Sequence, residues 1–241
     1  MGFLKYYGGT LILALLAGCG GSGSNAGSST TYSFVTPKVN FQKVYANTIL
    51  DNSSNTINQT QRNTLTAVNA DGSYVFVHDD PNNNSVTVNG TTYSTPTETI
   101  TDNNSGQELS HSFTNANGVL VTCTATPHGV GPSYPITVGQ TWTLNFVGTC
   151  GTAAPISYTQ TGVVAGVESV AVPAGTFSAV KLQSTETWTD NNGTKHTETI
   201  TTWRDTSTAI VVKRVTNMEY SGTALVNGYP VTETLVLNSQ S

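Results

Sequence analysis

The stretch that decides the fold is Val170-Ala171-Val172-Pro173-Ala174-Gly175-Thr176-Phe177-Ser178-Ala179-Val180-Lys181-Leu182. A proline fixes φ at the first corner of a turn, and Gly175 can take the positive φ with which the chain reverses. Apolar residues alternate with others on both sides of this turn, at Val170 and Val172 and again at Val180 and Leu182. The stretch therefore predicts a β-hairpin, whose arms we expect within residues 162–215.

Hairpin signals recur along the chain. Short runs of alternating apolar and polar residues are separated by Asp71-Gly72, Asn89-Gly90, Asn117-Gly118, Asn192-Gly193 and Asn227-Gly228. Such dipeptides are typical of tight turns between antiparallel strands. Beyond the first twenty residues no window has the periodicity of an amphipathic helix. The sequence predicts an all-β fold, an antiparallel meander of roughly a dozen strands that forms a curved sheet, a half-barrel or a sandwich.

The N-terminus has the features of an export signal. Lys5 is followed by the apolar run Leu11-Ile12-Leu13-Ala14-Leu15-Leu16, which is too short to span a bilayer. Leu16-Ala17-Gly18-Cys19 then resembles a bacterial lipobox. This resemblance implies that residues 1–18 are removed and that Cys19 is acylated, so that lipid anchors the protein in the cell envelope; the alternative is an ordinary secretory leader with a chance cysteine.

The residue after the lipobox cysteine bears on sorting. In bacterial lipoproteins an aspartate there favours retention in the inner membrane, whereas this chain has Gly20. The resemblance therefore implies the outer membrane rather than the inner one if the cell is Gram-negative. Residues 19–31 are rich in glycine and serine, and they predict a flexible linker between the lipidated cysteine and the folded part.

Residues 32–241 are long enough for one β domain or for two sub-sheets of about 32–115 and 116–241. Charged residues make up 10% of the chain and the net charge is −5. A surface that is weakly acidic and poor in charge argues against a nucleic-acid partner. The expected partners are therefore the membrane, which the protein contacts through the lipid on Cys19, and an unknown ligand that is a small apolar molecule, a glycan or a protein.

Two cysteines remain besides Cys19. Cys123 and Cys150 are expected to form a disulfide in an oxidising compartment, and two free thiols or a metal site are the alternatives. Between them, residues 127–135 hold three prolines and two glycines, which predicts an irregular loop.

Candidates for chemistry are few. Residues 78–84 gather oxygen ligands but lack the spacing of a calcium loop, so a solvated turn is favoured. The four histidines are scattered, and no Gly-x-Ser-x-Gly elbow occurs. Glu186 and Glu198 lie on the two arms of the hairpin expected at Asn192-Gly193. They suggest either the pair of catalytic carboxyl groups of a glycosidase or a solvent-exposed face of the sheet. We therefore predict no catalytic, cofactor or metal residues, and a protein that is not an enzyme.

Three aromatic residues are candidates for ligand contact. Trp188, Trp203 and Tyr220 can form a flat platform for a carbohydrate or a lipid, or they can pack in the core.

A second resemblance covers about the C-terminal third of the chain. Val172-Pro173-Ala174-Gly175-Thr176-Phe177, Thr202-Trp203 and Ile210-Val211-Val212-Lys213 resemble β-rich bacterial envelope proteins of uncharacterised function. The resemblance implies a curved antiparallel sheet and transfers no catalytic residues. The function expected from the sequence is a non-catalytic, membrane-anchored envelope lipoprotein whose β domain binds a ligand or partner or has a structural role. The alternatives are a carrier of lipids or lipoproteins with a concave sheet, and a hydrolase.

Overall fold

The computed structural model describes residues 30–35, 38–82, 85–88, 91–94, 96–115, 117–221 and 230–241. Within these ranges the chain forms sixteen strands, and no helix there is long and apolar enough to cross a bilayer. Cys19 and the sequence up to residue 29 lie outside the described residues, as do the turns expected at Asn89-Gly90 and Asn227-Gly228. The strands are β1 (Thr31–Tyr32), β2 (Gln42–Asp51), β3 (Thr56–Val68), β4 (Tyr74–Asp79), β5 (Ser85–Val88), β6 (Thr91–Ser94), β7 (Glu98–Asp102), β8 (Glu108–Thr114), β9 (Leu120–Thr126), β10 (Ile136–Thr137), β11 (Thr141–Cys150), β12 (Ile156–Val172), β13 (Gly175–Thr189), β14 (Lys195–Asp205), β15 (Val211–Ser221) and β16 (Pro230–Gln240).

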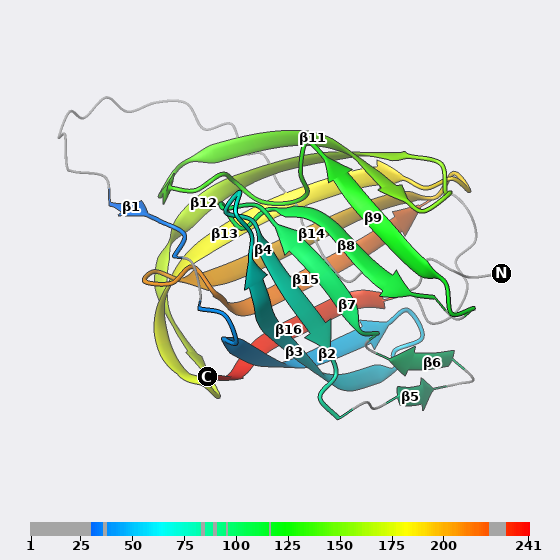
Figure 1. The fold of residues 1–241 in the computed structure, drawn as a ribbon, viewed down its shortest axis with the longest axis horizontal. Coiled ribbons are helices and arrows are strands. Elements are labelled where there is room, and N and C mark those ends of the chain that lie inside the picture. Colours follow the sequence, from blue (N-terminus) through cyan, green and yellow to red (C-terminus); the bar gives the residue numbers. More distant parts are fainter. Residues whose placement is uncertain are drawn as a thin grey trace.

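Twelve of the described strands close into one antiparallel barrel (Figure 1). Around it the order is β11, β12, β13, β14, β15, β16, β2, β3, β4, β7, β8 and β9. Consecutive strands pair as a meander, and the circle is completed where β16 pairs with β2 and where β9 pairs with β11. The prediction of an all-β antiparallel meander is confirmed. The sheet closes fully, which removes exposed strand edges, and strands from both 32–115 and 116–241 belong to the same barrel.

Five of the described hairpins share one turn geometry. In residues 69–73, 103–107, 115–119 and 190–194 the first amide donates to the fifth carbonyl, and the fourth amide donates back to the first carbonyl. The fourth residue of these turns is a glycine with φ between 71° and 83°. The turn at 51–55 makes the same bonds, but Ser54 occupies the fourth position at φ 63°. This geometry is a three-residue loop that ends in a left-handed residue, where glycine is the favoured residue type.

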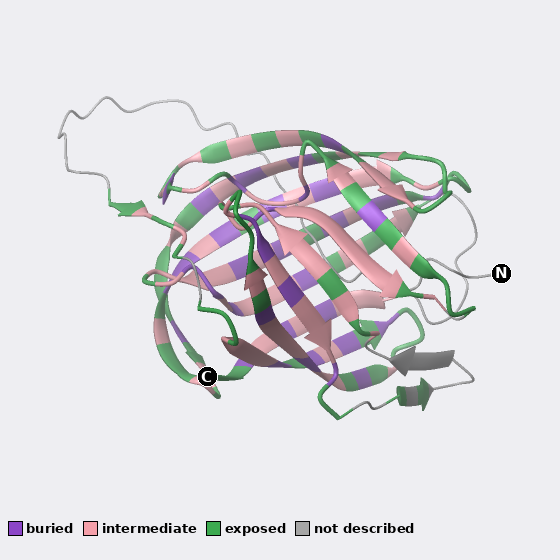
Figure 2. Cartoon of the chain, in the orientation of Figure 1, coloured by how far each residue is buried: buried purple, intermediate pink, exposed green. Residues whose placement is uncertain are grey.

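Buried residues alternate with more exposed residues along many of the strands (Figure 2). This is the pattern expected when successive side chains point in turn to the outer surface and to the barrel interior, which we call the lumen. On β14 the buried residues are His196, Glu198, Ile200 and Thr202, and the intervening residues are threonines and Trp203. Threonine is also the commonest residue at the outer positions of β11. The outer positions of β14 are therefore mostly polar and uncharged, while its glutamate and histidine face the lumen.

Two segments cover the end of the barrel at which β12 turns into β13. The tip of that hairpin folds inward, since the amide of Ala174 donates to the carbonyl of Leu237 and Phe177 packs near Tyr45. Residues 127–140, which we call the plug, connect β9 to β11 and include β10, and β10 pairs with β1. Ile136 of the plug is fully buried against Val164, Val180 and Leu182. Burying such a side chain stabilises the fold by about 2–3 kcal/mol.

A disulfide joins Cys123 of β9 to Cys150 of β11. The two residues are direct cross-strand neighbours at the seam where the barrel closes. That seam has only four paired positions, from Val147 with Thr126 to Cys150 with Cys123. The covalent bond thus holds one of the shortest strand pairings of the barrel.

Candidate functional site: the polar lumen

A continuous row of rings, which we call the aromatic arc, crosses five adjacent strands on the lumen side. Its members are paired one with the next, from β11 to β15: Phe146, Tyr158, Trp188, His196 and Tyr220. The planes of Trp188 and His196 are parallel within 6° at 4.6 Å, and those of Phe146 and Tyr158 within 4° at 4.8 Å. Nε2 of His196 also lies 3.3 Å from Oδ2 of Asp190. The arc therefore places five neighbouring rings on the lumen side, with two of its neighbouring pairs stacked face to face.

Three buried glutamates, which we call the carboxylate cluster, lie next to this arc. Glu186 and Glu198 are direct cross-strand neighbours, and Glu233 follows two strands away on β16. All three are at most 6% exposed. Burial raises the pKa of Glu186 well above its usual value, and the charge of Glu198 adds to this effect. The pKa of Glu198 is also raised well above its usual value, by burial and by Glu233.

The cluster has few partners of opposite charge. Glu233 accepts a hydrogen bond from Nδ2 of Asn47 at 2.8 Å, and Arg214 lies 4.0 Å from its other oxygen. Among the described residues, Glu186 accepts one hydrogen bond, a long one of 3.4 Å from Gln160. Since a carboxyl group that is buried without a cation is favoured in its neutral form, Glu186 and Glu198 are available as donors as well as acceptors.

The facing part of the barrel holds imidazole and carboxyl groups in pairs. His78 of β4 lies 3.7 Å from Glu98 of β7, and Nδ1 of His111 lies 2.6 Å from Oε1 of Glu108 on β8. Burial lowers the pKa of His78 to about 4 and raises that of Glu98 to about 7. Burial also opposes the charge on His111, but the bond with Glu108 outweighs it and the pKa of His111 is raised.

Several buried polar atoms that face the lumen have no hydrogen-bond partner within the described protein. They lie on β14, β15, β2, β3 and β4, and we call this set the polar wall: Glu198 Oε2, Arg214 Nε, Thr216 Oγ1, Asn47 Oδ1, Gln59 Nε2, Asn63 Oδ1 and His78 Nε2. Leaving one such atom unbonded costs about 1–3 kcal/mol. Because donors and acceptors are mixed, the wall matches molecules that both donate and accept, such as water or a compound with several hydroxyl groups.

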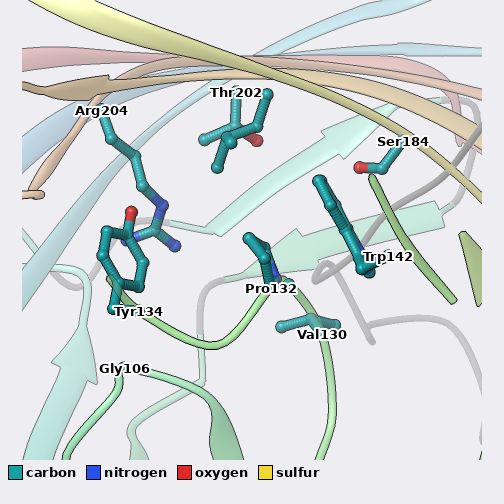
Figure 3. Close-up of a pocket in the computed structure, with 10 residues that line it drawn as sticks. Gly106, Val130, Pro132, Tyr134, Trp142, Ser184, Thr202 and Arg204 are labelled. Carbon is teal, nitrogen blue, oxygen red and sulfur yellow. The ribbon is translucent and has the colours of Figure 1, made fainter. Parts of the chain in front are cut away.

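The number of strands sets how wide the lumen of a barrel is. Inward side chains just fill a barrel of about eight strands, and this barrel has twelve. Three apolar side chains of the lumen face, Phe113, Val121 and Leu144, are only partly buried. Beneath the plug lies a small cavity of about 30 Å³ (Figure 3), lined by Trp142, Ser184, Thr202, Arg204, Tyr134 and residues 130–132. That cavity has space for a water molecule, not for an acyl chain.

Hydrogen bonds connect the plug with the carboxylate cluster. Oε1 of Gln160 accepts from the amide of Gly131 in the plug at 2.8 Å and from Nε1 of Trp142 at 2.9 Å. The amide nitrogen of the same Gln160 side chain donates to Glu186. Gln160 is fully buried, so one side chain fixes the plug, the indole and a carboxyl group together.

The structure separates the three aromatic residues that the sequence grouped as a platform. Trp188 and Tyr220 belong to the aromatic arc, whereas Trp203 is on the outer surface between Lys181 and Lys213. Its indole donates a hydrogen bond to Glu168. The suggested approach of Glu186 and Glu198 does occur, but on the buried face of the sheet.

The oxygen-rich stretch 78–84 is used by the fold. Asp79 forms an ion pair with Arg62, Asp80 accepts from the amide of Asn82, and residues 83–84 lie outside the described part.

The sequence reading missed most of the lumen residues, although a signal is present. The triplet Thr-Glu-Thr occurs at 97–99, 185–187, 197–199 and 232–234. In all four triplets the glutamate shares the lumen face and the threonines lie on the outside. From the sequence alone this alternation predicts a solvent-exposed sheet face, because charged residues are seldom fully buried.

Comparisons with known proteins find similarity in overall fold alone. No protein-family model matches it, and no curated protein matches its sequence. Among solved structures, a protein from Parabacteroides distasonis provisionally named a lipoprotein is similar over 88% of this chain and all of its own, with 12% identity and a TM-score of 0.49. A protein from Bacteroides fragilis with a YmcC-like fold, provisionally named an exported protein, has 12% identity, the same coverage and a TM-score of 0.48. The hypothetical lipoprotein YmcC from Escherichia coli has 13% identity, a TM-score of 0.43, and coverage of 81% of this chain and 83% of its own.

Proposed function

We propose that this chain is a lipid-anchored protein of the bacterial envelope whose barrel lumen binds a hydroxyl-rich ligand of the saccharide type. The observation that carries the proposal is the polar wall, a set of buried donors and acceptors on neighbouring strands without protein partners. Each hydroxyl group of a sugar can accept from one such atom and donate to another. Glu186 and Glu198, whose pKa values are raised by burial, add acceptors beside the aromatic arc and would add donors when protonated.

The lumen fits a saccharide better than the apolar ligand of a carrier. An acyl chain needs a continuous apolar cleft of roughly 300 Å³ or more. The lumen instead presents Glu98, Glu186, Glu198 and Glu233 within one enclosed surface. Transfer of a chain of methylene groups to such a surface would leave these polar groups without water or partners.

Binding without catalysis also accounts for the carboxyl groups. Hydrolysis of a glycosidic bond by a carboxyl pair needs one protonated group and one ionised group. The pKa values of Glu186 and Glu198 are both raised, and both groups are almost completely buried. Burial thus disfavours the ionised form of both groups, and a carboxyl pair that hydrolyses needs one of them ionised, so we propose a binding protein rather than a hydrolase.

The anchor rests on the lipobox. Acylation of Cys19 would hold the barrel to the membrane through the linker of residues 19–31, and Gly20 supports an outer-membrane destination in a Gram-negative cell. Mass analysis of the N-terminal peptide from the native host tests this part. A diacylglyceryl mass on Cys19 supports it, and an unmodified thiol refutes it.

Ligand binding is tested separately with the purified barrel. Soluble oligosaccharides prepared from bacterial envelopes serve as probes in native mass spectrometry and in titration calorimetry. Two substitutions, Thr216→Val and Asn47→Leu, remove unpartnered atoms of the polar wall, and Thr199→Val on the outer surface of β14 is the matched control. We expect both lumen variants to weaken binding at least tenfold and the control to leave it unchanged. Stoichiometric phospholipid in the native protein, or equal binding by all variants, would contradict the proposal.

A further inference from the structure

Three residues of the lumen face form one row across neighbouring strands. His111 of β8 pairs with Cys123 of β9, and Cys123 pairs with Cys150 of β11. One ligand atom from each residue lies within 4.8 Å of the others. Two sulfurs and an imidazole nitrogen this close together are the donor set of a zinc site.

The imidazole is held by a carboxylate, as in many zinc sites. Nδ1 of His111 is 2.6 Å from Oε1 of Glu108, which is three residues away on the same strand. A carboxylate on one ring nitrogen fixes the ring and its tautomer, and it makes the other nitrogen a better ligand. Glu108 is therefore placed as a positioning residue for a metal bound through Nε2.

We propose that this row is a zinc site whenever the disulfide is reduced, so that the barrel seam is closed either by the Cys123–Cys150 bond or by a Zn²⁺ ion bound to Cys123, Cys150 and His111. In the first step a dithiol reductant gives two electrons and two protons to the disulfide. The S–S bond breaks, two thiols form, and the reductant becomes a disulfide. In the second step Zn²⁺ binds both sulfurs as thiolates, and the two thiol protons pass to solvent.

The backbone can accommodate both forms. The Cα atoms of the two cysteines are 4.0 Å apart, and the register places both cysteines on the same face of the sheet as His111. In a tetrahedral site with Zn–S bonds of about 2.3 Å the two sulfurs are about 3.8 Å apart, a change that rotation about the side-chain bonds can supply. Three protein ligands leave the fourth position of the metal to water from the lumen.

The test uses the chain with Cys19→Ser, so that the two cysteines of the barrel are the only thiols. The protein is reduced with a phosphine, and Co²⁺ and then Zn²⁺ are added. We expect one Co²⁺ per chain with the near-ultraviolet absorption of a thiolate–cobalt bond, displacement by one Zn²⁺, and a higher melting temperature of the reduced protein with Zn²⁺. The oxidised protein is expected to show none of these effects.

Variants assign the ligands. We expect His111→Gln to lower the zinc affinity more than tenfold and Glu108→Gln to lower it about tenfold. His128→Gln in the plug is the matched control and should bind as the parent does, because His128 lies outside the row. Reduced protein that binds no Co²⁺ or Zn²⁺ overturns the proposal, whether it stays folded or unfolds. Equal affinity of His111→Gln and the parent overturns the assignment of the histidine.

Discussion

Among the described glycines, Gly162 has the least space for an added methyl group. A Cβ atom placed on Gly162 would lie 1.8 to 2.2 Å from three ring atoms of Trp142. These distances are far below any real contact, and the indole is held by its bond to Gln160 at 2.9 Å and by Ile136 of the plug. In Gly162→Ala the ring must therefore leave its place.

The cost follows from the contacts that are lost. Overpacking of a buried site costs about 1–3 kcal/mol, and loss of the hydrogen bond to Gln160 adds about 1 kcal/mol. We expect Gly162→Ala to lower the free energy of unfolding by about 2–4 kcal/mol. Gly166 lies on the same strand with no atom within 4 Å of an added Cβ, so Gly166→Ala should change stability by no more than about 0.5–1 kcal/mol.

Urea unfolding followed by tryptophan fluorescence measures both variants. The reasoning also predicts that the two residues are coupled, so that Gly162→Ala costs little when Trp142 has already been replaced by leucine. If Gly162→Ala and Gly166→Ala unfold at the same urea concentration, or if the cost persists without Trp142, the indole does not occupy the space over Gly162.

Three further predictions concern the seam, a turn and the buried carboxyl groups. Replacing Cys123 and Cys150 together by alanine should cost about 3.5 kcal/mol, from the loop entropy of their separation of 27 residues, as measured by urea unfolding. Ser54→Gly should stabilise the protein by about 0.5–1 kcal/mol in the same assay, because Ser54 has φ 63° where the four related turns have glycine. Unfolding measured between pH 4.5 and 8 should show stability falling as pH rises, since raised carboxyl pKa values mean that the folded chain keeps protons which the unfolded chain releases. Glu186→Gln with Glu198→Gln should make that fall smaller, by up to about 1.4 kcal/mol per pH unit for each proton removed.

Each of these has a result that would contradict it. If the disulfide is the source of the stability, the reduced parent and the double alanine variant should be equally stable, and both should be less stable than the oxidised parent. If the double alanine variant is as stable as the oxidised parent, the disulfide does not stabilise the barrel. A destabilised Ser54→Gly would mean that the serine hydroxyl matters more than its backbone angle. If the parent protein is most stable at pH 8, the buried carboxyl groups are ionised in the folded barrel, and the prediction is wrong.

Sequence reasoning predicted the strands well because the turns are encoded locally. A glycine three residues after an aspartate or asparagine gives the common turn at 103–107, 115–119 and 190–194 with no help from the rest of the molecule. Closure of the barrel was not predictable in this way. It depends on pairing between β16 and β2 and between β9 and β11, which no local pattern of residues specifies.

The lumen was hidden for a different reason. Glutamate between two threonines is compatible with either face of a strand, and only the register decides which one is enclosed. Once β13 and β14 are paired, Glu186 faces Glu198, and the same parity places Trp188 in the aromatic arc and Trp203 outside. The grouping of Trp203 with Trp188 and Tyr220 therefore could not be tested before the register was known.

The pairing of β2 with β16 has a consequence for how the molecule assembles. Its partners are far apart in the chain, as the bond between Asn47 and Glu233 spans 186 residues. Each hairpin can form as soon as its two strands have been synthesised. In contrast, β2 gains its second neighbour only when β16, the last strand of the chain, is present. The entropy of closing so long a loop is lost before any contact is made, so closure of the barrel should be the slow step of folding. Until that step, β2 has an unpaired edge that can pair with a strand of another molecule.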